Sequence, residues 1–184
     1  MTAALILAAG SGRRMGGPKA LLRVEGDTLL RRAARAALEA GCRPVLAVVG
    51  NWDPGLQDLE VQAVVNVEAE EGMARSIRMG VAALPAGAQA VLILGVDQPA
   101  VDATLLEGLL ALAARQPDRP AACAYGDTLG IPAVLPRRLF PALAALRGDR
   151  GAKGILLQEG AAALPFPEGA TDLDTPEDLE RIRR

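Results

Sequence analysis

The sequence predicts an α/β fold: a three-layer α/β/α sandwich with a mostly parallel, Rossmann-like sheet. Short apolar runs alternate with amphipathic stretches of helical periodicity in the order β-α-β-α-β. The apolar runs are continuous rather than alternating with polar residues, which is typical of parallel strands buried on both faces. After Pro120 the runs become closely spaced around Gly126-Asp127, which predicts mixed or antiparallel pairing in the C-terminal part of the sheet.

Each element follows from this pattern. The strands are predicted at residues 3–7, 44–49, 61–65, 90–94, 121–125 and 131–135. The helices are predicted at residues 28–40, 76–84, 102–115, 136–146, 151–158 and 176–183. The last helix has Thr175 at its cap and Pro176 at its first position, where proline is favoured.

The predicted helix 28–40 has the clearest amphipathic pattern. One stripe is apolar and consists of Leu30, Ala33, Ala34, Ala37 and Leu38. Three arginines, Arg31, Arg32 and Arg35, lie largely on the other side, which we interpret as a solvated face rather than a partner site. Asp27 is the expected N-cap, and Gly41 follows the helix end.

Length and composition indicate one globular domain that spans residues 1–184. The chain is 51% hydrophobic and 23% charged, which excludes intrinsic disorder. Its 20 basic and 22 acidic residues give a net charge of −2, so no basic excess favours nucleic acid or an anionic membrane. Aromatic residues make up only 2%, which argues against a stacking platform for single-stranded nucleic acid.

The chain has no histidine, which excludes a Ser-His-Asp triad, a histidine base and histidine-ligated metals. Its two cysteines, Cys42 and Cys123, are too few for a disulfide scaffold and are expected to be reduced and buried unless the fold brings them together. The apolar start, residues 1–10, is short and lacks a basic segment, so we do not expect it to be a signal peptide. No apolar run approaches the roughly 20 residues of a membrane span. We therefore expect a cytoplasmic protein.

The segment after the first strand has the features of a phosphate-binding loop. It reads Leu7-Ala8-Ala9-Gly10-Ser11-Gly12-Arg13-Arg14-Met15-Gly16-Gly17-Pro18-Lys19. Glycines allow backbone N–H groups to approach a phosphate, and the three cations suit a triphosphate. The dinucleotide fingerprint fails because Met15 stands at its third glycine, and the P-loop fails because Pro18 precedes Lys19.

Acidic residues at two places are candidate ligands for Mg²⁺. Asp97 follows the strand 90–94, at the edge where open α/β sheets bind ligands. Mg²⁺ usually takes one or two protein carboxylates together with phosphate and water. Asp172 and Asp174 share a face if their segment is extended. One of them would then supply a second metal ligand; the alternative is that Asp172 or Asp174 is a solvated turn residue.

The loop motif Leu-Ala-Ala-Gly-x-Gly-x-Arg-Met-Gly, ending in lysine, resembles the signature of the glycosyltransferase-A-like (MobA-like) nucleotidyltransferases. Arg14, Met15, Gly16 and Lys19 stand on signature positions. The segments similar to the molybdenum cofactor cytidylyltransferase group are 72–80, 97–99, 130–132, 148–153 and 172–176. Where that group often has histidine, this chain has Ile131, so the resemblance supports the reaction type more firmly than the acceptor. It implies a fold of the nucleotide-diphospho-sugar transferase type.

The resemblance implies Mg²⁺-dependent transfer of CMP from CTP to a phosphate monoester, molybdopterin in first place, with release of pyrophosphate. Nucleotide binding would then fall to Leu7, Ala8, Ala9, Gly10, Gly12, Arg14, Lys19, Ser76 and Asp97. The catalytic residues would be Arg14, Lys19 and Asp97, the metal ligands Asp97 and Asp174, and the acceptor residues Gly130, Pro132, Asp149 and Lys153. Cytidine is favoured because guanylyl-transferring relatives tend to have glycine and serine at Ala9 and Gly12. The product would pass to a molybdoenzyme or its maturation chaperone.

Two other interpretations stay open. The first keeps the fold and changes the substrates, giving a guanylyltransferase or a transferase for a sugar phosphate, a polyol phosphate or phospholactate. The second is a regulatory module that binds nucleotide and has lost catalysis. The joint presence of Lys19, Asp97 and Asp174 favours an enzyme.

Overall fold

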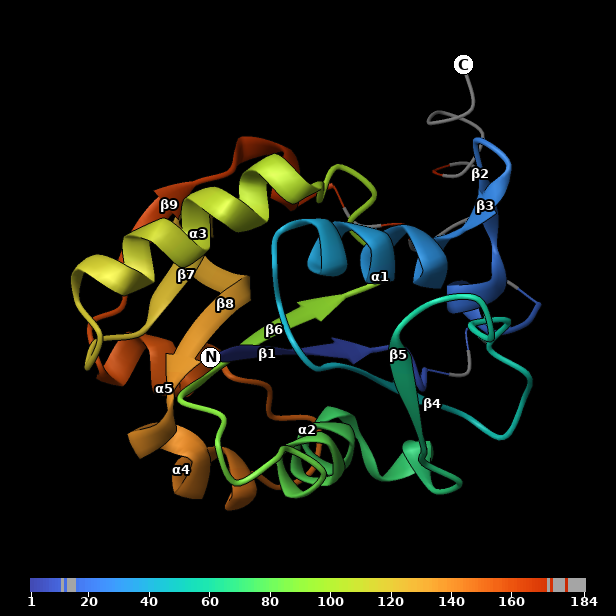
Figure 1. Cartoon of the computed structure of the whole chain (residues 1–184), viewed down its shortest axis with the longest axis horizontal. Helices are drawn as coiled ribbons and strands as arrows, with labels where there is room; N and C mark the ends of the chain where they lie inside the picture. Colours follow the sequence, from blue (N-terminus) through green and yellow to red (C-terminus); the bar gives the residue numbers. More distant parts are fainter. Residues whose placement is uncertain (11, 13–15, 172, 174–177, 179–184) are drawn as a thin grey trace.

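A seven-stranded sheet forms the middle layer of the molecule (Figure 1). The structure, a computed structural model, describes residues 1–10, 12, 16–171, 173 and 178. From edge to edge, the strands are β5 (Val61–Val65), β4 (Val45–Val49), β1 (Thr2–Leu7), β6 (Ala90–Gly95), β8 (Thr128–Pro136), β7 (Ala121–Tyr125) and β9 (Ala162–Pro165).

The pairing of these strands is mostly parallel. β5, β4, β1 and β6 run parallel to one another, and Leu7 at the end of β1 is in register with Gly95 at the end of β6. β8 is antiparallel to both β6 and β7, whereas β9 is parallel to β7. The predicted sheet, parallel in its first half and mixed in its C-terminal part, is therefore confirmed.

Helices cover both faces of the sheet (Figure 1). One face carries α1 (Leu29–Glu39) and α3 (Ala103–Arg115), and the other carries α2 (Met73–Ala82), α4 (Phe140–Ala144) and α5 (Lys153–Gln158). Ala4 and Ile6 of β1 pack into the core beneath α1 and α3, while Leu5 packs into the core on the opposite face. Two apolar cores explain why the strand sequences are continuously hydrophobic.

Several boundaries differ from the predicted ones. α2 begins at Met73, three residues before the predicted Ser76, and the predicted helix 136–146 is the 3₁₀ turn η4 (Arg137–Leu139) followed by α4. The N-cap of α1 is Thr28, whose hydroxyl accepts from the Arg31 N–H at 3.2 Å, so the prediction of Asp27 as the cap is wrong. Most of the predicted helix 176–183 lies outside the described residues, as does its Thr175 cap.

Five short elements among the described residues were not predicted. They are the hairpin of β2 (Arg23–Val24) and β3 (Asp27–Thr28) and the 3₁₀ turns η2 (Lys19–Leu21), η3 (Ala69–Glu71) and η5 (Pro167–Ala170). The edge strand β9 was also missed, because its four residues end in proline and carry little alternation. Among the residues the structure describes, no helix has the length and apolar character to cross a bilayer.

Both cysteines are buried and unpaired, as expected. Burial raises the pKa of the Cys42 thiol to about 11 and that of the Cys123 thiol to about 12. Both thiols therefore stay protonated at neutral pH and act as small apolar core residues.

Close packing of α2 against β1 fixes the position of the helix. Gly80 is buried, and a Cβ atom at this residue would lie 2.1 Å from Cδ1 of Leu5, which is itself fully buried. No larger residue fits between the helix and the strand unless Leu5 moves. The glycine thus lets α2 approach the sheet directly behind the strand end that leads into the loop 8–19.

We expect Gly80→Ala to lower the free energy of unfolding by about 1–3 kcal/mol, because the added methyl group overpacks a filled core. Gly108→Ala is the matched control within α3, where the new Cβ would meet only Leu164 Cδ2 at 3.7 Å. That control should raise stability by up to about 1 kcal/mol through helix propensity. Urea unfolding followed by circular dichroism measures both values. A Gly80→Ala protein as stable as Gly108→Ala would contradict the packing described here.

Candidate functional site

A cleft of about 350 Å³ opens at the carboxyl ends of β1 and β6. The end of β1 and the loop after it contribute Leu7, Ala8, Ala9, Gly10, Gly12, Lys19 and Ala20. The end of β6 contributes Gly95, Val96 and Asp97, and the segment leading into α2 contributes Ala69, Gly72, Met73 and Ser76. Ile131 and Asp149 complete the described lining. This is the edge of an open α/β sheet where ligands bind.

The loop after β1 is held close to the sheet. The Ala8 N–H donates to the Val48 carbonyl at 2.9 Å and thus extends the parallel ladder by one residue. Gly12 has a φ of +55°, and a Cβ there would lie 2.0 Å from the Gly17 carbonyl oxygen. Only glycine fits this crossing point of the loop. The turn η2 then begins at Lys19, which lines the cleft.

Asp97 stands where β6 ends. A Cβ at Gly95 would lie 2.6 Å from Asp97 Oδ1, so the missing side chain makes room for the carboxylate. The Asp97 carbonyl accepts from the Leu173 N–H at 2.9 Å, and Gln98 Nε2 donates to the Gly169 carbonyl at 3.0 Å. These bonds attach the C-terminal segment to the strand end that carries Asp97.

The start of α2 is joined to the turn at residues 148–149. Gly72 precedes the helix with a φ of +104°, and a Cβ there would lie 2.5 Å from both Asp149 Oδ1 and the Gly148 carbonyl oxygen. The Ala74 N–H donates to that same carbonyl at 3.1 Å. The contact places Asp149 in the wall of the cleft that Lys19 also lines, although the two residues are far apart in the sequence.

The structure brings most of the predicted site residues together. In the predicted nucleotide set, the residues that line this one cleft are Leu7, Ala8, Ala9, Gly10, Gly12, Lys19, Ser76 and Asp97. Arg14, Asp172 and Asp174 lie outside the described residues.

Among the predicted acceptor residues, only Asp149 lines the cleft. Gly130 instead packs beneath Tyr125, whose hydroxyl oxygen would lie 2.0 Å from a Cβ at that position. Pro132 is buried in β8, and Lys153 is exposed at the start of α5. The side chain of β8 that does reach the cleft belongs to Ile131, between the two residues that were predicted.

Sequence reasoning missed Asn66, a buried residue that hydrogen-bonds to Ser76 in the cleft wall. A signal for it exists. Asn66 is the first polar residue after the apolar run 61–65, in the same kind of position that Asp97 has after 90–94. Polar residues at the carboxyl ends of parallel strands are site candidates in general.

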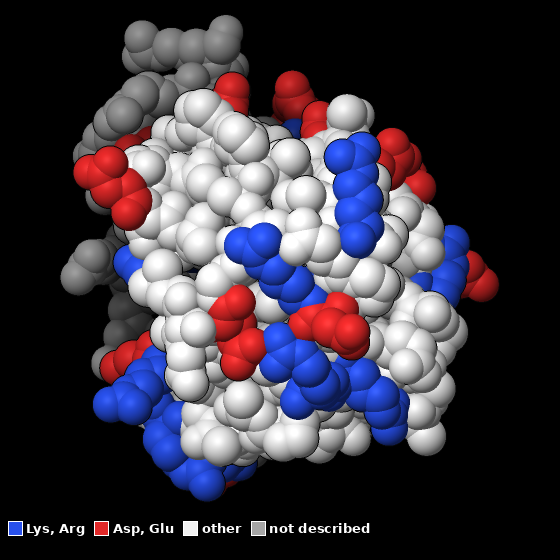
Figure 2. Space-filling model, turned by 90° about the vertical axis from the view of Figure 1, so that its left-hand side faces the viewer, with Lys and Arg blue, Asp and Glu red and all other residues white. Residues whose placement is uncertain are grey.

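The face that carries α3, α5 and β9 bears both basic and acidic side chains, and the basic ones gather mainly in its lower part (Figure 2). Basic and acidic side chains are interspersed there, and one such pair is Arg138 with Glu159 at 2.5 Å.

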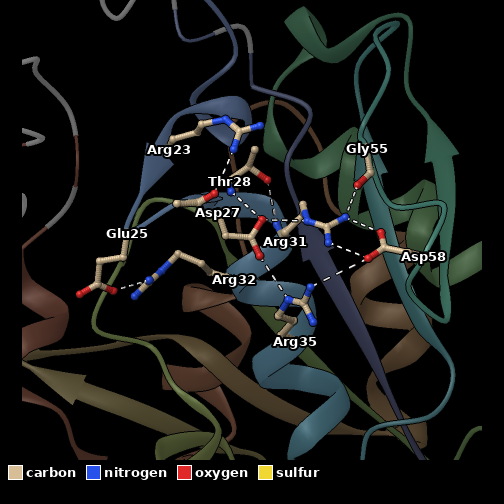
Figure 3. A network of polar contacts seen from close by, with 10 residues as sticks. Arg23, Glu25, Asp27, Thr28, Arg31, Arg32, Arg35, Gly55 and Asp58 are labelled. Carbon is tan, nitrogen blue, oxygen red and sulfur yellow. Dashed lines mark hydrogen bonds and ion pairs between the residues drawn. The ribbon is translucent and has the colours of Figure 1, made fainter.

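A second, polar hollow of about 680 Å³ lies between the β2–β3 hairpin and residues 53–55. Arg31 spans it: Nε donates to Asp27 Oδ1 at 2.8 Å, and Nη1 and Nη2 donate to the two Asp58 oxygens at 2.6 and 2.8 Å (Figure 3). Nη1 also donates to the Gly55 carbonyl. Arg31 is partly buried, so the prediction that it belongs to a solvated face is wrong. These contacts form an ionic clamp that holds segment 53–58 against α1.

The clamp shifts the titration of its carboxylates. Hydrogen bonds from Arg31 lower the pKa of Asp58 to about 2. Burial acts to raise the pKa of Asp27, but hydrogen bonds from Arg35, the Thr28 N–H and Arg31 outweigh it, and the pKa is lowered. The charges here satisfy one another, which makes the clamp a structural device rather than a second ligand site.

Comparison with known proteins identifies the family. The model of the MobA-like NTP transferase domain matches residues 4–163. The chain belongs to this family. The MobA-like match confirms the resemblance seen in the loop motif and makes the chain a nucleotidyltransferase by family.

Individual relatives cover nearly the whole chain. Nicotine blue oxidoreductase from Paenarthrobacter nicotinovorans is 33% identical, over 97% of this chain and 94% of its own. Molybdenum cofactor guanylyltransferase from Rhodobacter capsulatus is 34% identical, over 97% and 93%. The crystal structure of Rv0371c from Mycobacterium tuberculosis superposes with a TM-score of 0.81 and 27% identity, over 100% of this chain and 97% of that one. Such agreement confirms the nucleotidyltransferase-type fold.

We expect the ionic clamp to make part of the stability of this MobA-like protein depend on pH. The folded-state pKa of Asp58 is depressed to about 2 from 3.8, so its contribution is complete above the unfolded-state value and is lost as the pH falls through about 2. The stability difference between wild type and Asp58→Asn should therefore be constant above about pH 5 and shrink between pH 4 and 2.

Urea unfolding of both proteins across this pH range measures the difference. The same substitution in an Arg31→Met background is the control, and there the pH dependence should be much smaller. A difference between wild type and Asp58→Asn that does not change from pH 5 to pH 2 would contradict the clamp.

Proposed function

We propose that this MobA-like nucleotidyltransferase moves a cytidylyl group from CTP to a phosphate monoester, with molybdopterin as the first candidate acceptor, and releases pyrophosphate. One observation carries the proposal: the glycine-rich loop, Lys19 and Asp97 line a single cleft at the ends of β1 and β6. Its volume of about 350 Å³ is within the range of small-molecule sites.

The residues of the loop suit a triphosphate. Gly10 is exposed, and among the described residues other than its chain neighbours no heavy atom lies within 4 Å of the place where its Cβ would be, which suits the approach of a ligand to the backbone. Lys19 supplies positive charge toward the phosphates and the departing pyrophosphate. In the proposal Arg14, which lies outside the described residues, adds to this charge.

The reaction needs no strong base. An oxygen of the acceptor phosphate attacks the α-phosphorus of the NTP, the bond from that phosphorus to the α–β bridging oxygen breaks, and pyrophosphate leaves with the electron pair. The attacking oxygen is already anionic, so catalysis depends on positioning and on neutralisation of charge. This chemistry suits a chain that contains no histidine.

The carboxylate oxygen atoms that the cleft offers are suitable ligands for Mg²⁺. Within the described part of the chain, no group of three or more acidic, cysteine or histidine side chains forms a metal cage. Mg²⁺ does not need one, because it is usually held by one or two carboxylates with phosphate and water. Asp97 would hold the ion, together with Asp174 or Asp172 from outside the described residues. When bound, Mg²⁺ neutralises charge on the phosphate oxygens.

The resemblance favours cytidine over guanosine, because guanylyl-transferring relatives tend to have glycine and serine where this chain has Ala9 and Gly12. A relative 34% identical nevertheless carries the name molybdenum cofactor guanylyltransferase, which makes GTP the second candidate nucleotide. Sugar phosphates, polyol phosphates and phospholactate are the further acceptors to test.

One relative is named an oxidoreductase, which suggests a different reaction. A dinucleotide cofactor would need the glycine fingerprint, and here Met15 replaces its third glycine. The residues therefore favour nucleotidyl transfer, and any recipient of the product, a molybdoenzyme or its chaperone, belongs to the same proposal.

The test crosses each NTP with a panel of acceptors in the presence of Mg²⁺ and measures pyrophosphate. We expect release with CTP and molybdopterin, and we expect Asp97→Asn to lower the rate by about 100-fold or more while the protein stays folded. Asp118→Asn, at an exposed position outside the cleft, is the matched control and should keep the wild-type rate.

Three results would count against the proposal. Full activity of Asp97→Asn would remove Asp97 from the metal role. Release only with another acceptor would replace molybdopterin. A folded wild-type protein that binds NTP but gives no pyrophosphate with any pair would identify a nucleotide-binding module instead of an enzyme.

A further inference from the structure

A buried pair of polar side chains forms part of the cleft wall. Asn66 is 1% exposed and directly follows β5, and its N–H donates to the Val49 carbonyl at 2.8 Å. Ser76 is 6% exposed, lies in the first turns of α2 and lines the cleft. Asn66 Nδ2 donates to Ser76 Oγ at 3.1 Å.

The contacts of Asn66 fix which way its amide points. Its Oδ1 accepts from the Glu68 N–H and from Arg75 Nε, both at 3.1 Å. These two groups can only donate, so the amide oxygen must face them and the amide nitrogen must face Ser76. Arg75 is itself held by Glu71, whose Oε2 lies 3.0 Å from Nη1, and by Glu68.

This orientation leaves the Ser76 hydroxyl with its proton available. An amide N–H₂ group cannot accept, so Ser76 Oγ uses a lone pair toward Asn66 and keeps its own proton for another partner. Within the residues that the structure describes, the hydroxyl has no hydrogen-bond acceptor for that proton. As far as the described residues go, the proton of the Ser76 hydroxyl is therefore available to an acceptor that enters the cleft.

We propose that Asn66 is a positioning residue that sets the Ser76 hydroxyl as a hydrogen-bond donor toward the nucleoside part of the bound nucleotide. The inference rests on the proposed function and deepens it. The free proton suits a nucleoside edge that offers an acceptor, such as a ring carbonyl oxygen, a ring nitrogen or a ribose oxygen.

Three variants test whether Asn66 positions the Ser76 hydroxyl. Ser76→Ala removes the donor. Asn66→Asp keeps the shape and the contacts to Glu68 and Arg75, but its carboxylate accepts the Ser76 proton and so withdraws it from the ligand. The third variant combines both changes. Asn51→Asp adds the same charge at an exposed position outside the cleft and is the matched control.

Calorimetric titration with CTP and with GTP, in the presence of Mg²⁺, gives the dissociation constants. We expect Ser76→Ala and Asn66→Asp each to weaken binding of the preferred nucleotide roughly three- to tenfold, the worth of one hydrogen bond. The double variant should be no weaker than either single variant, because both changes remove the same bond. Asn51→Asp should bind as the wild type does.

Inorganic triphosphate is the probe that separates positioning from general effects. It has no nucleoside, so all variants should bind it as tightly as the wild type. A structural disturbance or a simple charge effect of Asn66→Asp would weaken triphosphate and nucleotide alike, and would overturn the inference.

Other outcomes are equally clear. If Asn66→Asp does not fold, Asn66→Ala replaces it in the cycle, and the double variant should lose less than the product of the two single losses. Losses of nucleotide affinity that multiply in the double variant would overturn the positioning role of Asn66 alone. Nucleotide binding that is unchanged in the folded Asn66 variant would do the same. A wild-type protein that binds no NTP would overturn both the proposed function and the positioning role of Asn66.

Discussion

Leu7 and Gly95 are partners in register at the ends of two neighbouring parallel strands, and the site depends on this pairing. Because β1 and β6 run in the same direction, their carboxyl ends reach the same edge of the sheet together. The loop that follows Leu7 and the carboxylate that follows Gly95 are thereby held on two sides of one cleft. A cationic loop and an acidic side chain are thus brought together by backbone hydrogen bonds, whose geometry is independent of the charges themselves.

Missing side chains give the site its shape as much as the side chains that are present. Gly12 allows the loop to cross itself, Gly95 leaves space for Asp97, and Gly72 lets residues 148–149 reach α2. Gly80 allows α2 to lie close to β1, so that Ser76 reaches the cleft from the other side. Glycine is costly in folded chains, because it loses more backbone entropy than other residues. In this protein these glycines stand where two segments or side chains come close together, and these close contacts position the residues of the site.

The sequence predicts the central features well because their physical signals are strong. Buried parallel strands read as continuous apolar runs, and the glycine-rich loop and Asp97, each after such a run, do line one cleft. Weaker signals gave errors: the hydroxyl of Thr28 caps α1 in place of Asp27, because Asp27 pairs with Arg31 instead. Ile131 rather than its neighbours reaches the cleft, since strand alternation turns Gly130 and Pro132 away from it. Contacts between segments far apart in the sequence, such as Gly72 with Asp149, leave no local pattern.

The most direct test of the account is a map of nucleotide contacts by NMR. Amide resonances are recorded before and after addition of Mg²⁺ with CTP or GTP. We expect the largest shifts at Ala8 to Gly10, Lys19 and Gly95 to Asp97, with little change at the ionic clamp of Arg31 and Asp58. Shifts that cluster at the clamp, or that affect the β1 end without the β6 end, would contradict a single cleft built on the pairing of these two strands.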